Sequence, residues 1–81
     1  MPSGTRNTPA ESERRAIAVL RTAYLASGRS QRDLSRATGM SQANISKLFA
    51  GQKSVMLSEF YRLCTALGLD PVQVVDDAQR R

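Results

Sequence analysis

Apolar side chains recur every three or four residues in five successive segments of the chain. This spacing places them on one side of a helix, so each segment predicts an amphipathic helix. The apolar positions are Ile17, Leu20, Tyr24 and Leu25; Leu34 and Ala37; Ile45, Leu48 and Phe49; Phe60, Leu63, Cys64 and Leu67; and Val72, Val74 and Val75. No alternating run is long enough for a strand, so the sequence predicts an all-α fold, a compact five-helix bundle.

The ends of these helices coincide with residues that cap or stop helices. The predicted N-caps are Thr8, Ser30, Ser41 and Asp70, and the predicted stops are Gly28, Gly39, Gly51 and Gly68. Thr8 precedes Pro9 and is expected to form a capping box with Glu11, so the first helix is expected to start there. Ser30 is expected to pair with Asp33 in the same way.

The chain has 81 residues, which is a suitable length for one domain. Residues 1–7 contain Pro, Gly, Ser and Asn without apolar periodicity, and we expect them to form a flexible N-terminal arm. The helical domain is predicted to cover residues 8–78, and residues 79–81 are expected to fray.

A single cysteine, Cys64, and the absence of histidine limit the possible chemistry. They exclude an intramolecular disulfide, a zinc site and histidine-dependent catalysis. No paired carboxylates, nucleophile–base pair or phosphate-cradling loop is visible, so we expect no enzyme, no metal, no cofactor and no small-molecule ligand. The composition fits the reducing cytoplasm, and neither a signal segment nor an apolar run of membrane-spanning length is visible.

The chain is basic, with a net charge of +5, and this charge is unevenly distributed. Residues 29–53 carry a net charge of +4, whereas residues 54–79 carry a net charge of −3. A basic patch that is confined to one segment is typical of a protein that binds a polyanion. Charge alone fits a generally soluble cationic surface equally well.

Two of the predicted helices are short and are joined by a turn that contains Gly39 and Met40. The second runs from about Ser41 to Phe49. Opposite its apolar stripe it carries only Ser41, Gln42, Ala43, Ser46, Lys47 and Ala50. A slim helix face without acidic side chains is suited to the major groove of DNA, where phosphates surround the helix.

Residues 31–50, QRDLSRATGMSQANISKLFA, resemble the helix-turn-helix of the lambda-repressor and Cro-like proteins, the XRE family. The matching positions are Gln31, Leu34, Gly39, Met40, Ile45 and Leu48, and residues 57–71 resemble the fourth helix of that family. Ser35 and Cys64 replace common alanines, and Thr38 replaces an apolar residue, which we expect to weaken packing slightly. The resemblance covers about residues 16–76 and implies a lambda-repressor-like DNA-binding domain with its helix-turn-helix at the second and third helices.

The resemblance also implies roles for individual residues. Contacts to DNA bases are expected from Gln42, Ala43, Ser46 and Lys47. Contacts to DNA phosphates are expected from Arg6, Gln31, Arg32, Ser41, Asn44 and Lys53. Gln42 is the main candidate for base recognition, because a glutamine side chain bonds N6 and N7 of adenine together.

Several of these residues have a structural alternative. Asn44 is also placed to cap the third helix with Ser41, and Arg32 is placed to pair with Asp33. Gln31 and Lys53 have the simpler alternative of being solvated. The sequence leaves these alternatives open.

Together these features predict a transcriptional regulator, a repressor in the cytoplasm, at the nucleoid. The family resemblance implies that it binds near-palindromic double-stranded DNA as a homodimer, with half-sites roughly 34–36 Å apart. Val72, Val75 and the C-terminal end of the fourth helix are candidates for the dimer interface. The alternatives are an antitoxin or a restriction-modification controller that also binds a protein partner, and a protein-interaction adaptor with an incidental basic face.

Overall fold

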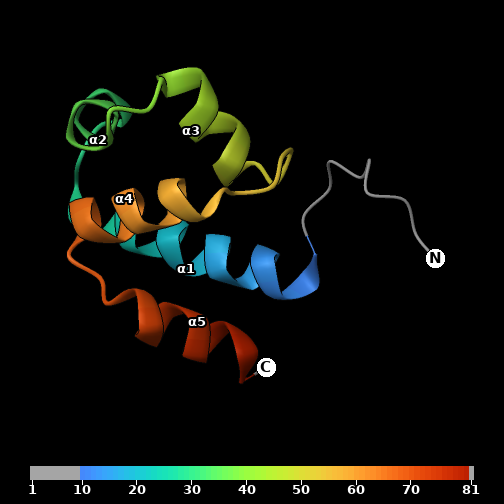
Figure 1. Cartoon of the computed structure of the whole chain (residues 1–81). Helices are drawn as coiled ribbons and strands as arrows, with labels where there is room; N and C mark the ends of the chain where they lie inside the picture. The colour runs from blue at the N-terminus through green and yellow to red at the C-terminus, as the bar shows by residue number, and fades with distance from the viewer. Residues whose placement is uncertain (1–9, 81) are drawn as a thin grey trace.

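The computed structural model describes residues 10–80, which form five α-helices (Figure 1). They are α1 (Glu11–Ser27), α2 (Gln31–Thr38), α3 (Gln42–Phe49), α4 (Leu57–Leu67) and α5 (Pro71–Gln79). No strand occurs among these described residues. The predicted all-α, five-helix architecture is therefore confirmed.

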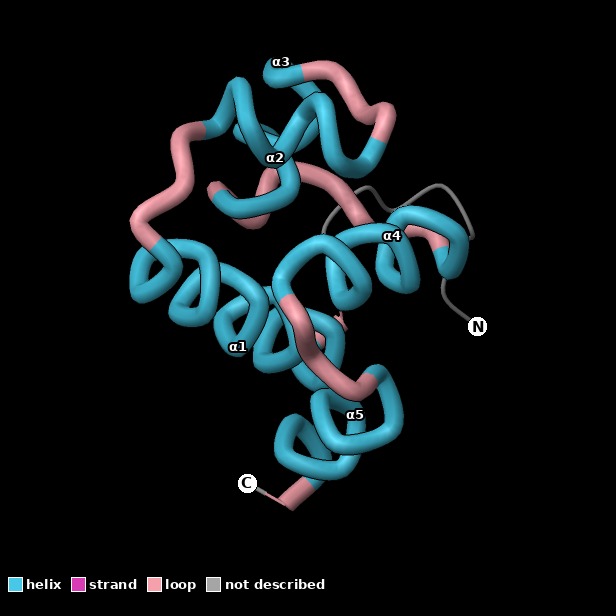
Figure 2. The backbone as a smooth tube through the Cα atoms, turned by 90° about the vertical axis from the view of Figure 1, so that its left-hand side faces the viewer, coloured by secondary structure: helices cyan, strands magenta, loops and turns pink. Residues whose placement is uncertain are grey.

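The longest helix, α1, lies at the centre of the bundle (Figure 1). α3 and α4 pack against it from one side and α5 packs against it from the other, while α2 contacts both α3 and α4. Figure 2 shows the result from a second direction, with α2 and α3 at one end of the molecule and α5 at the other.

The core draws its apolar side chains from all five helices. The most deeply buried side chains are Leu20, Leu34, Ile45, Leu48, Leu63 and Cys64. Burying one leucine or isoleucine completely stabilises a fold by roughly 1.5–3 kcal/mol. α2 and α3 have only eight residues each, and isolated helices of that length are marginal in water. Burial in the shared core therefore keeps both of them helical.

Two predicted core positions are exposed in the structure. Leu25 has 66% of its surface accessible, because it borders an open groove beside α3 instead of entering the core. Ala37 is also exposed, and Thr38 takes the inward position one turn after Leu34. The helical spacing counted only apolar residues, but Thr38, which the resemblance places at a usually apolar position, is buried with its hydroxyl group hydrogen-bonded.

The hydroxyl groups of Ser35 and Thr38 hold the turn between α2 and α3. The Thr38 hydroxyl donates to the carbonyl oxygen of Leu34 at 2.8 Å and accepts from the amide of Met40 at 3.2 Å. The Ser35 hydroxyl donates to the carbonyl oxygen of Met40. Gly39 has a φ of 75°, a left-handed conformation that disfavours any residue with a Cβ atom. Both hydroxyl residues therefore help to fix the backbone that leads into α3.

Three predicted N-caps are confirmed, since their side chains each accept a hydrogen bond from a first-turn amide. They are Ser30, Ser41 and Asp70. The capping box between Ser30 and Asp33 is also present. These caps satisfy backbone donors that helix geometry leaves without a partner.

The predicted start of α1 is wrong. Its N-cap is Ala10, whose carbonyl oxygen accepts a hydrogen bond from the amide of Arg14 at 2.9 Å. Glu11 is thus the first helical residue and not the third, as a cap at Thr8 would require. Its carboxylate there stabilises the positive end of the helix dipole. Residues 1–9, which include Arg6 and the predicted arm, lie outside the described residues, as does residue 81.

We predict that Thr38→Val destabilises the protein although it makes a buried residue more apolar. The substitution removes the acceptor of the Met40 amide, and an unpaired buried polar group costs about 1–3 kcal/mol of unfolding free energy. Urea unfolding of both proteins measures the difference. Thr65→Val is the matched control, because Thr65 is exposed on α4 and its replacement should change stability by less than about 0.5 kcal/mol. An increase in stability for Thr38→Val would contradict the prediction.

Candidate nucleic-acid interface

The outer face of α3 is exposed on the surface of the bundle. Its exposed residues are Ser41, Gln42, Ala43, Ser46, Lys47 and Ala50, the same six that form the predicted polar face. Ile45, Leu48 and Phe49 are buried on the opposite side. The structure therefore brings the four predicted base-contacting residues together on one accessible surface that carries a single charge, the cation of Lys47.

Aromatic packing fixes the C-terminal end of α3 against α1. The rings of Tyr24 and Phe49 have centroids 5.3 Å apart and an interplanar angle of 33°. Aromatic pairs at this distance add about 0.5–1.5 kcal/mol beyond the apolar area they bury. This contact holds α3 at a defined angle to the longest helix.

A polar network fixes the other side of α3 against α4. The Asn44 Nδ2 atom donates to Glu59 Oε2 at 2.8 Å, and Lys53 Nζ donates to Asn44 Oδ1 at 2.6 Å. Lys53 Nζ also lies 3.4 Å from Glu59 Oε2, and the Met56 amide donates to Glu59 Oε1 at 2.8 Å. One carboxylate thus joins α3, the following loop and the start of α4.

This network changes the interpretation of Asn44 and Lys53. The backbone amide of Asn44 donates to the Ser41 side chain, as expected for an N-cap at Ser41. The side chain of Asn44, however, donates to Glu59 and does not bond back to Ser41. The Lys53 side chain is 32% exposed and already has two partners. Both side chains are therefore occupied in holding the loop, and a phosphate contact by either one stays a prediction.

Residues at the start of α2 remain accessible beside α3. Gln31 is the first residue of α2 and is half-buried, and it borders a small hollow together with Ser46. Arg32 is exposed, and Asp33 bonds to the backbone of Ser30 without forming an ion pair with Arg32. Gln31 thus lies next to Ser46, a predicted base-contacting residue. This position suits a contact with a phosphate at the edge of the DNA groove that α3 would enter.

Arg21 of α1 lines the same hollow as Gln31 and Ser46, although the sequence did not single it out. Its place on α1 explains the omission, because α1 is not part of the two-helix motif. Arg21 and Leu25 are four residues apart and lie on the same face of α1, the face towards α3. That spacing could have indicated that Arg21 lies near the DNA-contacting surface. Only the folded structure shows that this surface extends from α3 to α1.

The pKa of Glu59 is lowered below its ordinary value of 4.5. Burial of the carboxylate alone would raise this pKa, but hydrogen bonds from Asn44 and the Met56 amide and the charge of Lys53 outweigh the burial. The ionised form is therefore the one that the fold stabilises. Burial and the charge of Asp70 raise the pKa of the Cys64 thiol, so that Cys64 remains a neutral core residue.

A separate apolar surface lies on α4 and α5. Leu57, Tyr61, Val72 and Val75 are all exposed and line one hollow between these two helices. Val74 points into the core instead. The exposed apolar residues of α4 thus lie in its first half, whereas its C-terminal end was the predicted location.

Within residues 10–80, no group of three or more His, Cys, Asp or Glu residues is arranged to hold a metal ion. In the same part of the chain, no helix combines the length and apolar character needed to cross a membrane.

Comparison with known proteins places this arrangement among DNA-binding regulators. A family model described as a helix-turn-helix domain matches residues 13–76. The clp gene regulator ClgR from C. glutamicum is 30% identical over 88% of this chain and 91% of its own, with a TM-score of 0.74. The restriction-modification controller protein C.AhdI from Aeromonas hydrophila is 29% identical over 73% of this chain and 86% of its own, with a TM-score of 0.67.

A third solved structure supports the fold alone. A mutant of C.Esp1396I bound to its highest affinity operator site is 14% identical, with a TM-score of 0.76, and the match covers 88% of this chain and 93% of that protein. Among curated proteins, the comparison finds no match.

We predict that Glu59→Gln destabilises the protein at pH 7 by about 1–3 kcal/mol, because the bonds to Asn44 and Lys53 lose their charged acceptor. The folded-state pKa is lowered, so this contribution is complete above pH 4.5 and disappears as the pH falls through the folded-state value. The difference between wild type and variant should therefore shrink below pH 4.5, as measured by urea unfolding.

Glu11→Gln is the control for this experiment. Glu11 is 71% exposed and lies 3.7 Å from Arg15, so its replacement should cost less than about 1 kcal/mol. A difference for Glu59→Gln that stays constant between pH 7 and pH 3 would show that ionisation of Glu59 does not stabilise the fold.

Proposed function

Because the chain belongs to the helix-turn-helix domain family, we propose that it is a transcriptional regulator that binds specific double-stranded DNA through α3. The observation that carries this proposal is the exposed, acid-free face of α3, which is held from behind by the buried Ile45 and Leu48. A helix presented in this way fits the major groove, where base pairs are distinguished by their donors and acceptors.

Base recognition is assigned to four residues on this face. Gln42 bonds to adenine, and Ala43 contacts a thymine methyl group beside it. Ser46 and Lys47 lie one turn further along α3 and reach the next bases or a phosphate. Since all four side chains are exposed in the structure, no rearrangement of the bundle is needed for these contacts.

Phosphate contacts position the protein on the duplex without reading sequence. Gln31 and Arg32 supply these contacts at the start of α2, where the positive end of the helix dipole also favours an anion. Ser41 contacts a phosphate at the start of α3. Asn44 and Lys53 extend the contact on the α4 side while keeping their bonds to Glu59. Arg6, which lies outside the described residues, is assigned to a phosphate of the DNA backbone.

The protein acts as a homodimer in which a second copy covers the apolar surface of α4 and α5. Val72 and Val75 are 75% and 41% exposed, and Leu57 and Tyr61 extend the same patch. A self-complementary patch joins two copies about a twofold axis, which matches a near-palindromic operator. As a repressor, the dimer occupies the promoter of the gene it controls, at the nucleoid in the cytoplasm.

A restriction-modification controller is the second candidate. The identity of 29% to C.AhdI over 86% of that protein supports it. Both candidates need the same DNA-contacting surface, whereas a protein-interaction adaptor needs none of it. The controlled gene separates a repressor from a controller, and DNA binding separates both from an adaptor.

We predict that Gln42→Ala lowers affinity for a duplex obtained by binding-site selection from random sequences by about 1–3 kcal/mol, because one bidentate base contact is lost. Preference should be relaxed at one base pair of each half-site. Fluorescence anisotropy with the selected duplex and its single-base variants measures both effects. Gln73→Ala on α5 is the control and should bind like the wild type. If Gln42→Ala and the wild type bind every duplex with equal affinity, the proposed base contact of Gln42 is wrong.

We predict that Val72→Glu shifts the dimer toward monomer, because it places a charge in an apolar interface. Val72 is exposed in the first turn of α5, so the substitution should leave the helix itself intact. Analytical ultracentrifugation should show at least about a tenfold weaker association, and melting temperature should change little. Thr65→Glu adds the same charge to an exposed position outside the patch and should leave association unchanged. A wild-type protein that stays monomeric at high concentration would contradict the dimer.

A further inference from the structure

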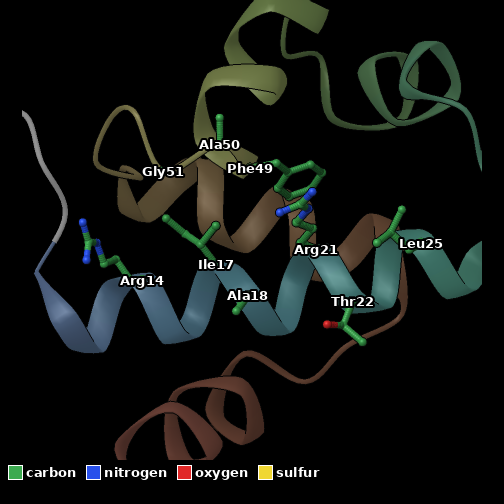
Figure 3. A pocket seen from close by; sticks show the side chains of 9 residues that line it. All are labelled: Arg14, Ile17, Ala18, Arg21, Thr22, Leu25, Phe49, Ala50 and Gly51. Atoms are coloured by element: carbon green, nitrogen blue, oxygen red, sulfur yellow. The ribbon is translucent and has the colours of Figure 1, made fainter.

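Two arginines of α1 line a groove between α1 and the end of α3. Figure 3 shows Arg14 and Arg21 rising from α1 on the side of Ala50 and Gly51. Phe49 contributes to the same lining. The groove therefore lies directly beside the helix that is assigned to base recognition.

Arg21 connects this groove to the DNA-contacting surface. It also lines the neighbouring hollow, together with Gln31 and Ser46. Gln31 is assigned to a phosphate and Ser46 to a base, so a DNA strand that contacts both of them passes next to Arg21. The groove with Arg14 continues from there along α1.

The charge of the groove favours an anion. Among the described residues, its lining includes both arginines and no carboxylate. Both side chains are exposed, and within residues 10–80 neither one takes part in an ion pair. A guanidinium group presents five donors that match phosphate oxygens, and it remains charged at any physiological pH.

The spacing of the two arginines suits an extended anion and not a single one. They are seven residues apart on α1, which is roughly 10 Å along the helix axis at about 1.5 Å per residue. In B-DNA one strand advances about 3.4 Å along the helix axis per phosphate. Two guanidinium groups at this separation therefore reach different phosphates of a strand.

We infer that Arg14 and Arg21 bind the sugar–phosphate backbone of the DNA that flanks each half-site. This inference rests on the proposed function, and it adds a contact from α1 that lies outside the two-helix motif. The contact raises affinity for every duplex and orients α3 in the groove, but it does not distinguish base sequences. Each neutralised phosphate contributes about 0.9 to the slope of log affinity against log salt.

The test compares the salt dependence of DNA binding for five proteins. They are the wild type, the double variant Arg14→Gln with Arg21→Gln, Arg21→Lys, Gln42→Ala, and Arg80→Gln. Arg80 is the charge control, because it follows α5, lines neither of the two hollows that Arg21 lines, and pairs with Asp76. Each is titrated by fluorescence anisotropy with the selected duplex and with an unrelated duplex, between 50 and about 300 mM salt, and circular dichroism verifies folding.

The double variant should bind both duplexes more weakly by the same factor, on the order of tenfold or more at about 0.1 M salt, and its salt slope should fall by about 1.8. Gln42→Ala should lose affinity only for the selected duplex and keep its slope, and Arg80→Gln should match the wild type. Arg21→Lys, which keeps the charge, should retain the slope.

The failures are distinguishable. If the wild type prefers its selected duplex but the double variant keeps wild-type affinity and slope, the inference is wrong and the proposed function stands. A loss that Arg80→Gln shares equally would also overturn it, because net charge and not the groove would be responsible. If the wild type prefers no duplex, the proposed function fails and takes this inference with it.

Discussion

The burial of one side of an eight-residue helix is the constraint on which the whole surface depends. α3 is too short to persist in water by itself, so its shape is maintained by Ile45 and Leu48 in the core and by Phe49 against Tyr24. The same burial decides which side chains remain outside. Stability and recognition are therefore coupled in α3, because every residue that anchors the helix also sets the direction of the face opposite to it.

The polar network around Glu59 complements this apolar anchoring. A buried carboxylate is tolerated only where hydrogen bonds and a nearby cation compensate for lost water, and here Asn44, Lys53 and the Met56 amide supply both. Directional bonds of this kind fix a position more narrowly than apolar contact does. The loop after α3 is thus tied to α4 through Glu59, and the Val55 amide ties it to α1 by donating to the Glu13 carboxylate.

Helical spacing and capping residues were sufficient to predict all five helices and the exposed face of α3, since both depend on neighbours in the sequence. The failures have tertiary causes. Leu25 borders a groove that exists only once α3 packs on α1, and Thr38 is buried because its hydroxyl finds partners in the turn. The partnership of Asn44 with Glu59 spans fifteen residues, so no local pattern indicates it.

The position of α1 between α3 and α5 has a mechanical consequence. A helix of 17 residues is a rigid rod, and α3 and α5 pack against opposite sides of it (Figure 1). In a dimer joined through α4 and α5, this rod fixes the distance between the two copies of α3. An operator whose half-sites do not match that distance must bend or twist to fit. The flexibility of central base pairs that no side chain touches then becomes part of the specificity.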